Sequence, residues 1–346
     1  MFELNIIWVL LVVMAVVWVG LDFIQYMSKG INQEKGEERP SPQSDTEVSV
    51  TGITKNDGPV AVTGASGYIG SRVVEDLMQQ GYEVHACVRD KSNGKKVDHL
   101  LNLNGQGLEG SVQLFEADLL DPGSYDQAFL GCAGVIHAGA ALGFNRETPQ
   151  EVYDGCFTQN EHVVESVKKA GTVKRLVFTS SFAAVGHPRQ EGYVFTEKDW
   201  CGDNVEGYRG AWTEENISKN RDIAYAMAKA NTEKMIYKAA EEDGSFEAVS
   251  INPLHVVGPL MSENHNQFFS WQFFIGQLLK GEDFGYINGK QLRGSTMLWN
   301  MVDVRDVARA HRLGTESPNA KNGSRYILSA TDRSGEMFTW ELQAKL

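Results

Sequence analysis

The sequence has few of the features by which proteins bind nucleic acids or structural metals. Its 346 residues include 32 Lys and Arg against 45 Asp and Glu, for a formal net charge of −13, and the basic residues form no clusters. Such clusters are needed to bind a phosphate backbone, so the composition argues against a nucleic-acid partner. The four cysteines are scattered, with no C-x-x-C and no paired histidine spacing, and are interpreted as reduced thiols. No metal site is predicted. Internal repeats and low-complexity tracts are also lacking.

One long hydrophobic run lies near the N-terminus. From Leu4 to Leu21 the chain carries a single polar side chain, Asn5, and no charge. As a helix this run would be about 27 Å long, at 1.5 Å per residue, which is just enough to span a bilayer. A cleaved signal peptide and a buried or interfacial helix are the alternatives, but the basic start and small-residue cleavage site of a signal peptide are missing. The prediction is one transmembrane helix, an anchor over residues 1–27.

The residues that follow this run predict its orientation and a linker. Lys29, Lys35 and Arg39 all lie on its C-terminal side. By the positive-inside rule they predict a single-pass membrane protein whose remaining chain faces the cytoplasm. Residues 28–58 are polar, with charges of both signs, and are interpreted as a flexible linker. The folded part is expected to begin near Pro59.

A glycine-rich turn follows the first apolar run of this folded part. Residues 60–63 read as a short strand, residues 71–80 have a helical pattern, and Gly64, Gly67 and Gly70 lie between them. In this setting the first glycine permits a tight turn, the second lets the backbone approach a pyrophosphate, and the third lets the helix pack on the strand. The turn is therefore predicted to bind a dinucleotide. The predicted contact residues are Thr63, Gly64, Gly67, Tyr68, Ile69 and Gly70.

Four further apolar runs predict more strands of one sheet. They cover residues 81–89, 113–119, 134–141 and 175–181, and helical stretches separate them. Continuous apolar runs are typical of parallel strands that are buried on both faces. The fold class is therefore predicted as α/β, a doubly wound parallel sheet of the Rossmann type, over residues 59–252. Residues 253–346 are interpreted as a smaller substrate-binding part.

Basic residues after the second strand favour NADP(H) over NAD. An NAD-selective site has an acidic residue at this strand end, whereas here Arg89 follows the strand and Lys95 and Lys96 come shortly after. A guanidinium and an ammonium suit a 2′-phosphate. Asp90 in the acidic role is the alternative, as is a solvated helix start for the two lysines. At the end of the next strand, Asp118 is predicted to hold the adenine amino group.

Two further signals lie downstream and concern proton transfer. Tyr225 and Lys229 are four residues apart in a strongly helical stretch, so they share a face. A free tyrosine has a pKa near 10, and an adjacent ammonium favours its phenolate, so Tyr225 can exchange a proton with a substrate oxygen at neutral pH. Ser181, at the end of the fifth strand, is predicted to orient that oxygen. Thr179 and Ser180 remain alternatives for this role. His137 is interpreted as a packed strand residue.

Taken together, these motifs resemble those of the extended short-chain dehydrogenase/reductase family. More narrowly, they are similar to the branch that contains dihydroflavonol reductases and cinnamoyl-CoA reductases. The matching stretches are residues 63–70, 88–90, 117–119, 175–181, 197–200, 225–229, 252–259 and 301–308. The resemblance implies that Ser181, Tyr225 and Lys229 are catalytic, with Lys229 also binding the nicotinamide ribose. The cofactor residues that it implies are Arg89, Lys96, Asp118, Leu119, Pro253 and Val256.

Some residues depart from the pattern of that branch. Gly186 stands where plant flavonoid reductases carry an Asn that holds the flavonoid, so a flavonoid substrate is in doubt. The N-terminal anchor is unusual for the branch and is similar to that of membrane-associated 3β-hydroxysteroid dehydrogenases. Relatives also continue for several elements beyond Leu346, so the substrate-binding part is expected to be C-terminally truncated.

The resulting prediction is NADPH-dependent reduction of an aldehyde or ketone, apolar or aromatic, with Tyr225 as the proton donor. The alternatives are a membrane-associated hydroxysteroid or sterol dehydrogenase and a non-catalytic dinucleotide-sensing protein. A sensor would be expected to lose Tyr225 or Lys229, and both are present. A sugar-nucleotide epimerase is disfavoured by Arg89. The substrate is expected to be a small molecule, and the oligomeric state is left open, a homodimer included.

Overall fold

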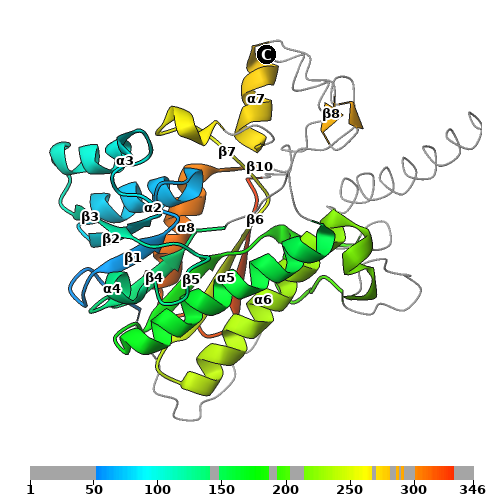
Figure 1. The fold of residues 1–346 in the computed structure, drawn as a ribbon, viewed down its shortest axis with the longest axis horizontal. Helices are drawn as coiled ribbons and strands as arrows, with labels where there is room; N and C mark the ends of the chain where they lie inside the picture. The colour runs from blue at the N-terminus through cyan, green and yellow to red at the C-terminus, as the bar shows by residue number, and fades with distance from the viewer. Residues whose placement is uncertain are drawn as a thin grey trace, which may run out of the picture.

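A seven-stranded sheet organises the part of the chain that the structure describes (Figure 1). The computed structural model describes residues 52–140, 148–186, 193–202, 214–266, 270–280, 286–287, 290–291 and 301–330. The sheet order is β11-β6-β5-β4-β1-β2-β3, and all its neighbours pair in parallel. The strands are β1 (Val60–Thr63), β2 (Glu83–Val88), β3 (Ser111–Glu116), β4 (Gly134–His137), β5 (Arg175–Thr179), β6 (Glu247–Pro253) and β11 (Ser324–Leu328).

Helices cover both faces of this sheet, so the predicted doubly wound α/β fold is confirmed. Side chains alternate along each strand, and in β1 Val60 and Val62 join one core cluster while Ala61 joins the other. The first cluster packs under α2 (Tyr68–Gln79), α3 (Gly94–Leu101) and α8 (Val304–Glu316). The second packs under α4 (Asp126–Phe129), α5 (Pro149–Ala170) and α6 (Arg221–Asp243), and α5 and α6 lie side by side (Figure 1).

Local signals explain where the two long helices begin and end. α5 starts with a capping box in which Thr148 accepts a hydrogen bond from the Glu151 N–H and the Glu151 side chain accepts from the Thr148 N–H. α6 is capped by Asn220, whose side chain accepts from the N–H groups of Asp222 and Ile223. Both helices end at a glycine in the left-handed conformation, Gly171 and Gly244. The caps therefore set the register of α6, on which the predicted proton-transfer residues lie.

The chain leaves the main sheet after β6 and returns to it later. The elements outside it are β7 (His255–Val257), α7 (Trp271–Leu279), β8 (Tyr286–Ile287), β9 (Lys290–Gln291) and β10 (Met301–Asp303). β7 pairs with β10, and β8 pairs with β9. α8 and β11 then pack on and within the main sheet. The short helical turns are η1 (Asn102–Gly105), η2 (Phe182–Ala184), η3 (Glu214–Lys219) and η4 (Glu263–His265). The predicted boundary at residue 253, between the cofactor-binding and substrate-binding parts, stays a prediction. β11, which lies beyond this boundary, is a strand of the main sheet.

The packed body includes residues ahead of the expected start at Pro59. Ile53 is buried, and its N–H donates to the Thr315 carbonyl of α8 at 3.0 Å. The polar residues around Ile53 mask this contact in the sequence. The predicted anchor, residues 1–27, lies outside the described residues. Within the described ranges, no helix has both the length and the apolar character needed to cross a bilayer.

Candidate active site

The glycine-rich turn joins β1 to α2 at the carboxyl edge of the sheet, where ligands bind in open α/β folds. Gly64 has a φ of 63°, and a Cβ there would lie 2.5 Å from the Gly139 Cα. A Cβ on Gly70 would lie 2.2 Å from the Gly64 carbonyl oxygen. Gly67 is the exposed N-cap of α2, so it leaves the helix N-terminus open to an anion. The turn thus has the shape that a pyrophosphate requires.

A segment from beyond β7 lies against this turn. The Tyr68 hydroxyl donates to the Gly258 carbonyl at 2.9 Å, and the Arg72 guanidinium donates to the Pro259 carbonyl at 2.9 Å. The His265 ring donates from Nε2 to the Ser66 carbonyl at 3.2 Å. Burial raises the pKa of Tyr68 well above its usual value, so its hydroxyl stays a donor. Tyr68 is therefore held by the protein at the edge of the predicted dinucleotide site.

The residues after β2 bear on the choice between NADP(H) and NAD. Arg89 and Lys96 are exposed. The Asp90 carboxylate accepts from the Ser92 hydroxyl at 2.6 Å and from the Ser92 N–H at 2.9 Å. These hydrogen bonds lower the pKa of Asp90, and the charge of Lys96 contributes. The acidic residue is thus engaged in its own turn, while the two basic side chains face solvent, an arrangement that fits a 2′-phosphate.

Five other predicted cofactor residues have distinct surroundings. Asp118 accepts from the Leu120 N–H at 2.9 Å through Oδ1 and is half-buried, so part of its carboxylate remains accessible. Leu119 is buried in the core beneath it. Thr63 is fully buried, and its hydroxyl accepts from the Gly139 N–H at 3.2 Å. The two remaining residues belong to later strands: Pro253 ends β6, and Val256 is half-buried in β7.

The three hydroxyl side chains at the end of β5, Thr179, Ser180 and Ser181, have different partners. Thr179 Oγ1 lies 2.7 Å from His311 Nε2, and because His311 Nδ1 must donate to the Val307 carbonyl, Nε2 of the neutral ring accepts from Thr179. Ser180 is buried and donates to Glu233. Ser181 is half-buried and accepts from the Ala183 N–H at 3.2 Å, so its own proton can be donated to a ligand. Among the three, this pattern favours Ser181 as the substrate-orienting donor.

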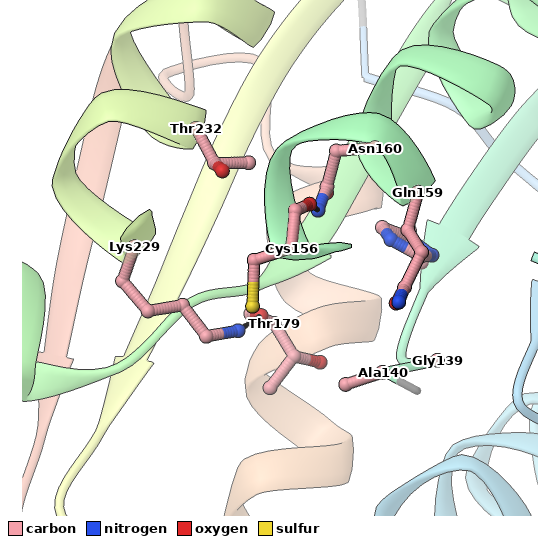
Figure 2. Close-up of a pocket in the computed structure, with 9 residues that line it drawn as sticks. Gly139, Ala140, Cys156, Gln159, Asn160, Thr179, Lys229 and Thr232 are labelled. Carbon is pink, nitrogen blue, oxygen red and sulfur yellow. Dashed lines mark hydrogen bonds between the residues drawn. The ribbon is translucent and has the colours of Figure 1, made fainter. Parts of the chain in front are cut away.

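Tyr225 and Lys229 lie one turn apart on α6, as their spacing predicts. The Lys229 Nζ is 5.8 Å from the centroid of the Tyr225 ring and donates to the Thr179 carbonyl at 3.2 Å. Figure 2 shows Lys229 reaching from α6 toward Thr179 at the end of β5. The ammonium therefore lies within cation–π distance of the Tyr225 ring. The site thus combines an acid, a cation and a strand-tip hydroxyl at one edge of the sheet.

A small cavity lies beside Lys229. Its volume is about 10 Å³, on the scale of one water molecule, so it does not have room for an organic substrate. Its lining residues include His137, Gly139, Cys156, Gln159, Asn160, Thr179, Lys229 and Thr232 (Figure 2). His137 Nδ1 is 2.5 Å from Thr63 Oγ1. Burial, together with the charge of Lys229, lowers the pKa of His137 to about 3. His137 is therefore a neutral, packed strand residue that also borders the site.

Sequence reasoning missed three buried polar residues around this site. Glu233 lies four residues after Lys229 on α6, and this spacing could have indicated that the two side chains share a face of the helix. His311 and Arg325 had no such signal, because their partners at the end of β5 and on α6 are distant in sequence. In the ranges that the structure describes, His, Cys, Asp and Glu side chains form no group of three that could hold a metal ion.

Comparisons with known proteins find related sequences and a shared fold. The NAD dependent epimerase/dehydratase family matches residues 60–328. The cinnamoyl-CoA reductase CAD2 of Medicago truncatula is 34% identical over 271 residues, which cover 75% of this chain and 73% of that protein. The bifunctional dihydroflavonol 4-reductase/flavanone 4-reductase of Pyrus communis is 37% identical over 275 residues, 79% of this chain and 72% of that protein. The yeast methylglyoxal/isovaleraldehyde reductase Gre2, solved with NADPH, shares the fold with a TM-score of 0.63, 24% identity, and coverage of 78% of each chain.

Proposed function

The chain belongs to the NAD dependent epimerase/dehydratase family, and we propose that it is a reductase that uses NADPH to convert an apolar or aromatic aldehyde or ketone into an alcohol. Its resemblance to the branch of dihydroflavonol and cinnamoyl-CoA reductases is confirmed, and the chain is an oxidoreductase like its named relatives. The observation that carries the proposal is the position of Lys229, between the Tyr225 ring and the carbonyl of Thr179.

Each of these residues has one task in the proposed reaction. When bound, NADPH supplies the hydride. Tyr225 donates its proton to the carbonyl oxygen of the substrate, and Ser181 donates a hydrogen bond to the same oxygen. The ammonium of Lys229, fixed by the Thr179 carbonyl at 3.2 Å, stabilises the Tyr225 phenolate that the transfer leaves. Solvent then returns a proton to Tyr225.

The cofactor is NADP(H), and the residues that follow β2 explain how its 2′-phosphate would be bound. Arg89 and Lys96 would hold the 2′-phosphate, because both are exposed beside a strand end whose one acidic candidate, Asp90, is bonded to Ser92. The pyrophosphate would lie on Gly67 at the start of α2, where the absence of a side chain leaves the helix N-terminus accessible. Asp118 and Leu119 would border the adenine.

The residues after Ser181 support an apolar substrate. A Cβ on Gly186 would lie 2.5 Å from the Phe182 ring, so a polar side chain at this position would displace that ring. Phe182 in turn packs edge-on against Phe195, with ring centroids 5.5 Å apart. An aromatic pair therefore lies beside Ser181, and its Phe182 ring occupies the space that a side chain at position 186 would need; plant flavonoid reductases carry an Asn at that position. This favours simple apolar or aromatic carbonyls over a hydroxylated flavonoid.

The experiment that tests the proposal is turnover by the full chain with NADPH. A panel of methylglyoxal, isovaleraldehyde, cinnamaldehyde, a dihydroflavonol and a 3-oxosteroid separates the reductase from a hydroxysteroid dehydrogenase.

Tyr225→Phe removes one hydroxyl and keeps the ring, so kcat should fall by about 100-fold or more while NADPH affinity survives. Lys229→Met should lower both kcat and the affinity for NADPH. NADPH binding without turnover of any compound would indicate a sensor, and a Tyr225→Phe variant with near-parental kcat would refute the mechanism.

We further propose the placement of the enzyme in the cell. Residues 1–27 would anchor it in a membrane as a single-pass helix, and residues 28–58 would link this anchor to a catalytic domain on the cytoplasmic side. The support is the uncharged run from Leu4 to Leu21 and the three basic residues that follow it. A homodimer belongs to the same proposal and can be tested by the mass of the detergent-purified chain.

A further inference from the structure

We propose that the buried pair Glu233–Arg325 is a positioning unit that sets Ser181 against Tyr225 and Lys229. This inference rests on the proposed function, because it concerns the geometry of the same three residues. Both side chains are almost inaccessible: Glu233 is 0% exposed and Arg325 is 6% exposed. Their ion pair, from Arg325 Nε to Glu233 Oε2, is 2.6 Å long. It joins α6, which carries the proton-transfer residues, to β11.

Glu233 holds the strand tip from the helix side. It lies one turn beyond Lys229 and two turns beyond Tyr225, on the face of α6 that meets β5 and β6. Its Oε1 accepts from the Ser180 hydroxyl and from the Asn252 amide, the latter at 2.6 Å. The same amide donates to the Ser181 carbonyl at 3.1 Å. One carboxylate thus fixes Ser180 directly and Ser181 through Asn252.

Arg325 holds the segment on the other side of Ser181. Its Nη2 donates to the Ala184 carbonyl at 3.2 Å, at the end of the η2 turn that begins after Ser181. Its Nη1 donates to the carbonyls of Glu197 at 2.9 Å and Asp199 at 2.6 Å. The guanidinium carbon lies 3.7 Å from the centroid of the Trp200 ring. All five donors of a guanidinium point in fixed directions, so this side chain can hold several loops in register.

Such a pair is a poor device for stability alone. Removing two charges from water costs a large fraction of what their attraction returns, and an apolar pair of the same size is often as stable. What the pair provides is a set of hydrogen bonds with fixed directions. The carboxylate accepts from Ser180, just before Ser181, and reaches the Ser181 carbonyl through the Asn252 amide, while the guanidinium donates to the Ala184 carbonyl three residues after Ser181. A change in either group is therefore expected to move the Ser181 hydroxyl relative to the Tyr225 hydroxyl.

The chain contains a matched control for this inference. Arg175 and Glu247 form a second Arg–Glu pair between β5 and β6, 2.8 Å long, with the Arg175 side chain fully buried. This pair lies at the amino ends of the two strands, whereas Glu233 and Arg325 act at the carboxyl end of β5. Loss of either pair should lower stability, but only loss of Glu233–Arg325 should change catalysis.

The test compares kinetics of the full chain with the best carbonyl of the panel above. Glu233→Gln should lower kcat by about tenfold or more and leave the Kd for NADPH within about twofold, whereas Glu247→Gln should leave kcat within about twofold. In a Ser181→Ala background, Glu233→Gln should lower kcat by less than about twofold, because the unit acts through Ser181. The double variant Glu233→Gln/Arg325→Met, which buries no unpaired charge, should reproduce the loss if Glu233→Gln alone fails to fold. Equal losses in the presence and absence of Ser181 would overturn the proposal.

Crystal structures of the parental chain and of the double variant provide a readout that needs no substrate. The expected result is a displaced Ser181 hydroxyl with α6 unchanged. An unmoved Ser181 would overturn the positioning role even if the parental enzyme turns over every carbonyl tested. A parental chain that reduces no carbonyl would instead refute the proposed function, and the structural comparison would still decide whether the pair positions Ser181.

Discussion

His311 makes the stability of the protein depend on pH in a way that can be measured. It is fully buried between α8 and β5, where it donates to the Val307 carbonyl and accepts from the Thr179 hydroxyl, each at 2.7 Å. Burial lowers the pKa of His311 to about 4. In the unfolded chain a histidine titrates near pH 6.5. Between these two pH values the unfolded chain binds a proton that the folded protein does not, so the free energy of unfolding falls as the pH falls.

The size of the effect follows from these two values. Each unit of difference between the folded and unfolded pKa is about 1.36 kcal/mol, and at pH 5 the loss attributable to His311 is about 2 kcal/mol. Above pH 7.5 the loss is close to zero, because the ring is neutral in both states. His311→Gln removes the titrating group and retains an amide that can accept from Thr179. The variant is expected to be less stable than the parent at pH 7.5, by about 1–2 kcal/mol for a perturbed buried hydrogen bond.

Urea unfolding of the full chain, followed by tryptophan fluorescence, measures the difference between parent and variant at each pH. Between pH 7.5 and pH 5 the parent should lose about 2 kcal/mol relative to the variant, because only the parent has His311 to protonate, so the initial gap of about 1–2 kcal/mol should close or reverse. The m-value should stay the same for both proteins. A gap that is constant over this range would show that His311 is not held neutral by its surroundings, and the assigned hydrogen bond from Thr179 would then be wrong.

Two further predictions concern the cofactor and the membrane. Arg89→Asp should raise the Michaelis constant for NADPH by about tenfold or more, on the order of 1.4 kcal/mol, while use of NADH changes little or improves; an unchanged constant would refute the 2′-phosphate assignment. Deletion of residues 1–28 should move the protein from the membrane to the soluble fraction and preserve NADPH binding, which fluorescence can measure. In the full chain Asn216, in a half-exposed sequon, should carry no glycan, and a glycan there would contradict the cytoplasmic placement.

The parts of the site that sequence could predict are those in which the chemistry is local. Gly64, Gly67 and Gly70 are meaningful through their spacing, and the structure has the tight turn and the close helix packing that this spacing implies. Tyr225 and Lys229 are related by one helical turn, so their proximity follows once α6 is recognised. The order of apolar runs similarly predicted five strands of the parallel sheet. In each case a contact between near neighbours in sequence carries the information.

The rest depends on contacts between distant residues. Arg325 has no local motif that distinguishes it from a surface arginine, and only the parallel pairing of β11 with β6 brings it to Glu233. Which hydroxyl of Thr179, Ser180 and Ser181 faces a ligand was open for the same reason, since their partners His311 and Glu233 lie on two different helices. Ile53 likewise appeared to be linker, because its contact is with α8.

The place of β11 at the edge of the sheet has a consequence for synthesis. Every residue proposed to touch substrate or cofactor precedes position 257, yet the arginine that holds the segment after Ser181 is supplied by a strand at Ser324–Leu328. A nascent chain that has emerged only through β7 therefore has the complete chemical machinery without the geometry to use it. Catalytic competence should arise late, when β11 docks beside β6, rather than gradually as the cofactor half folds. A partly made enzyme would thus be expected to bind dinucleotide before it can reduce anything.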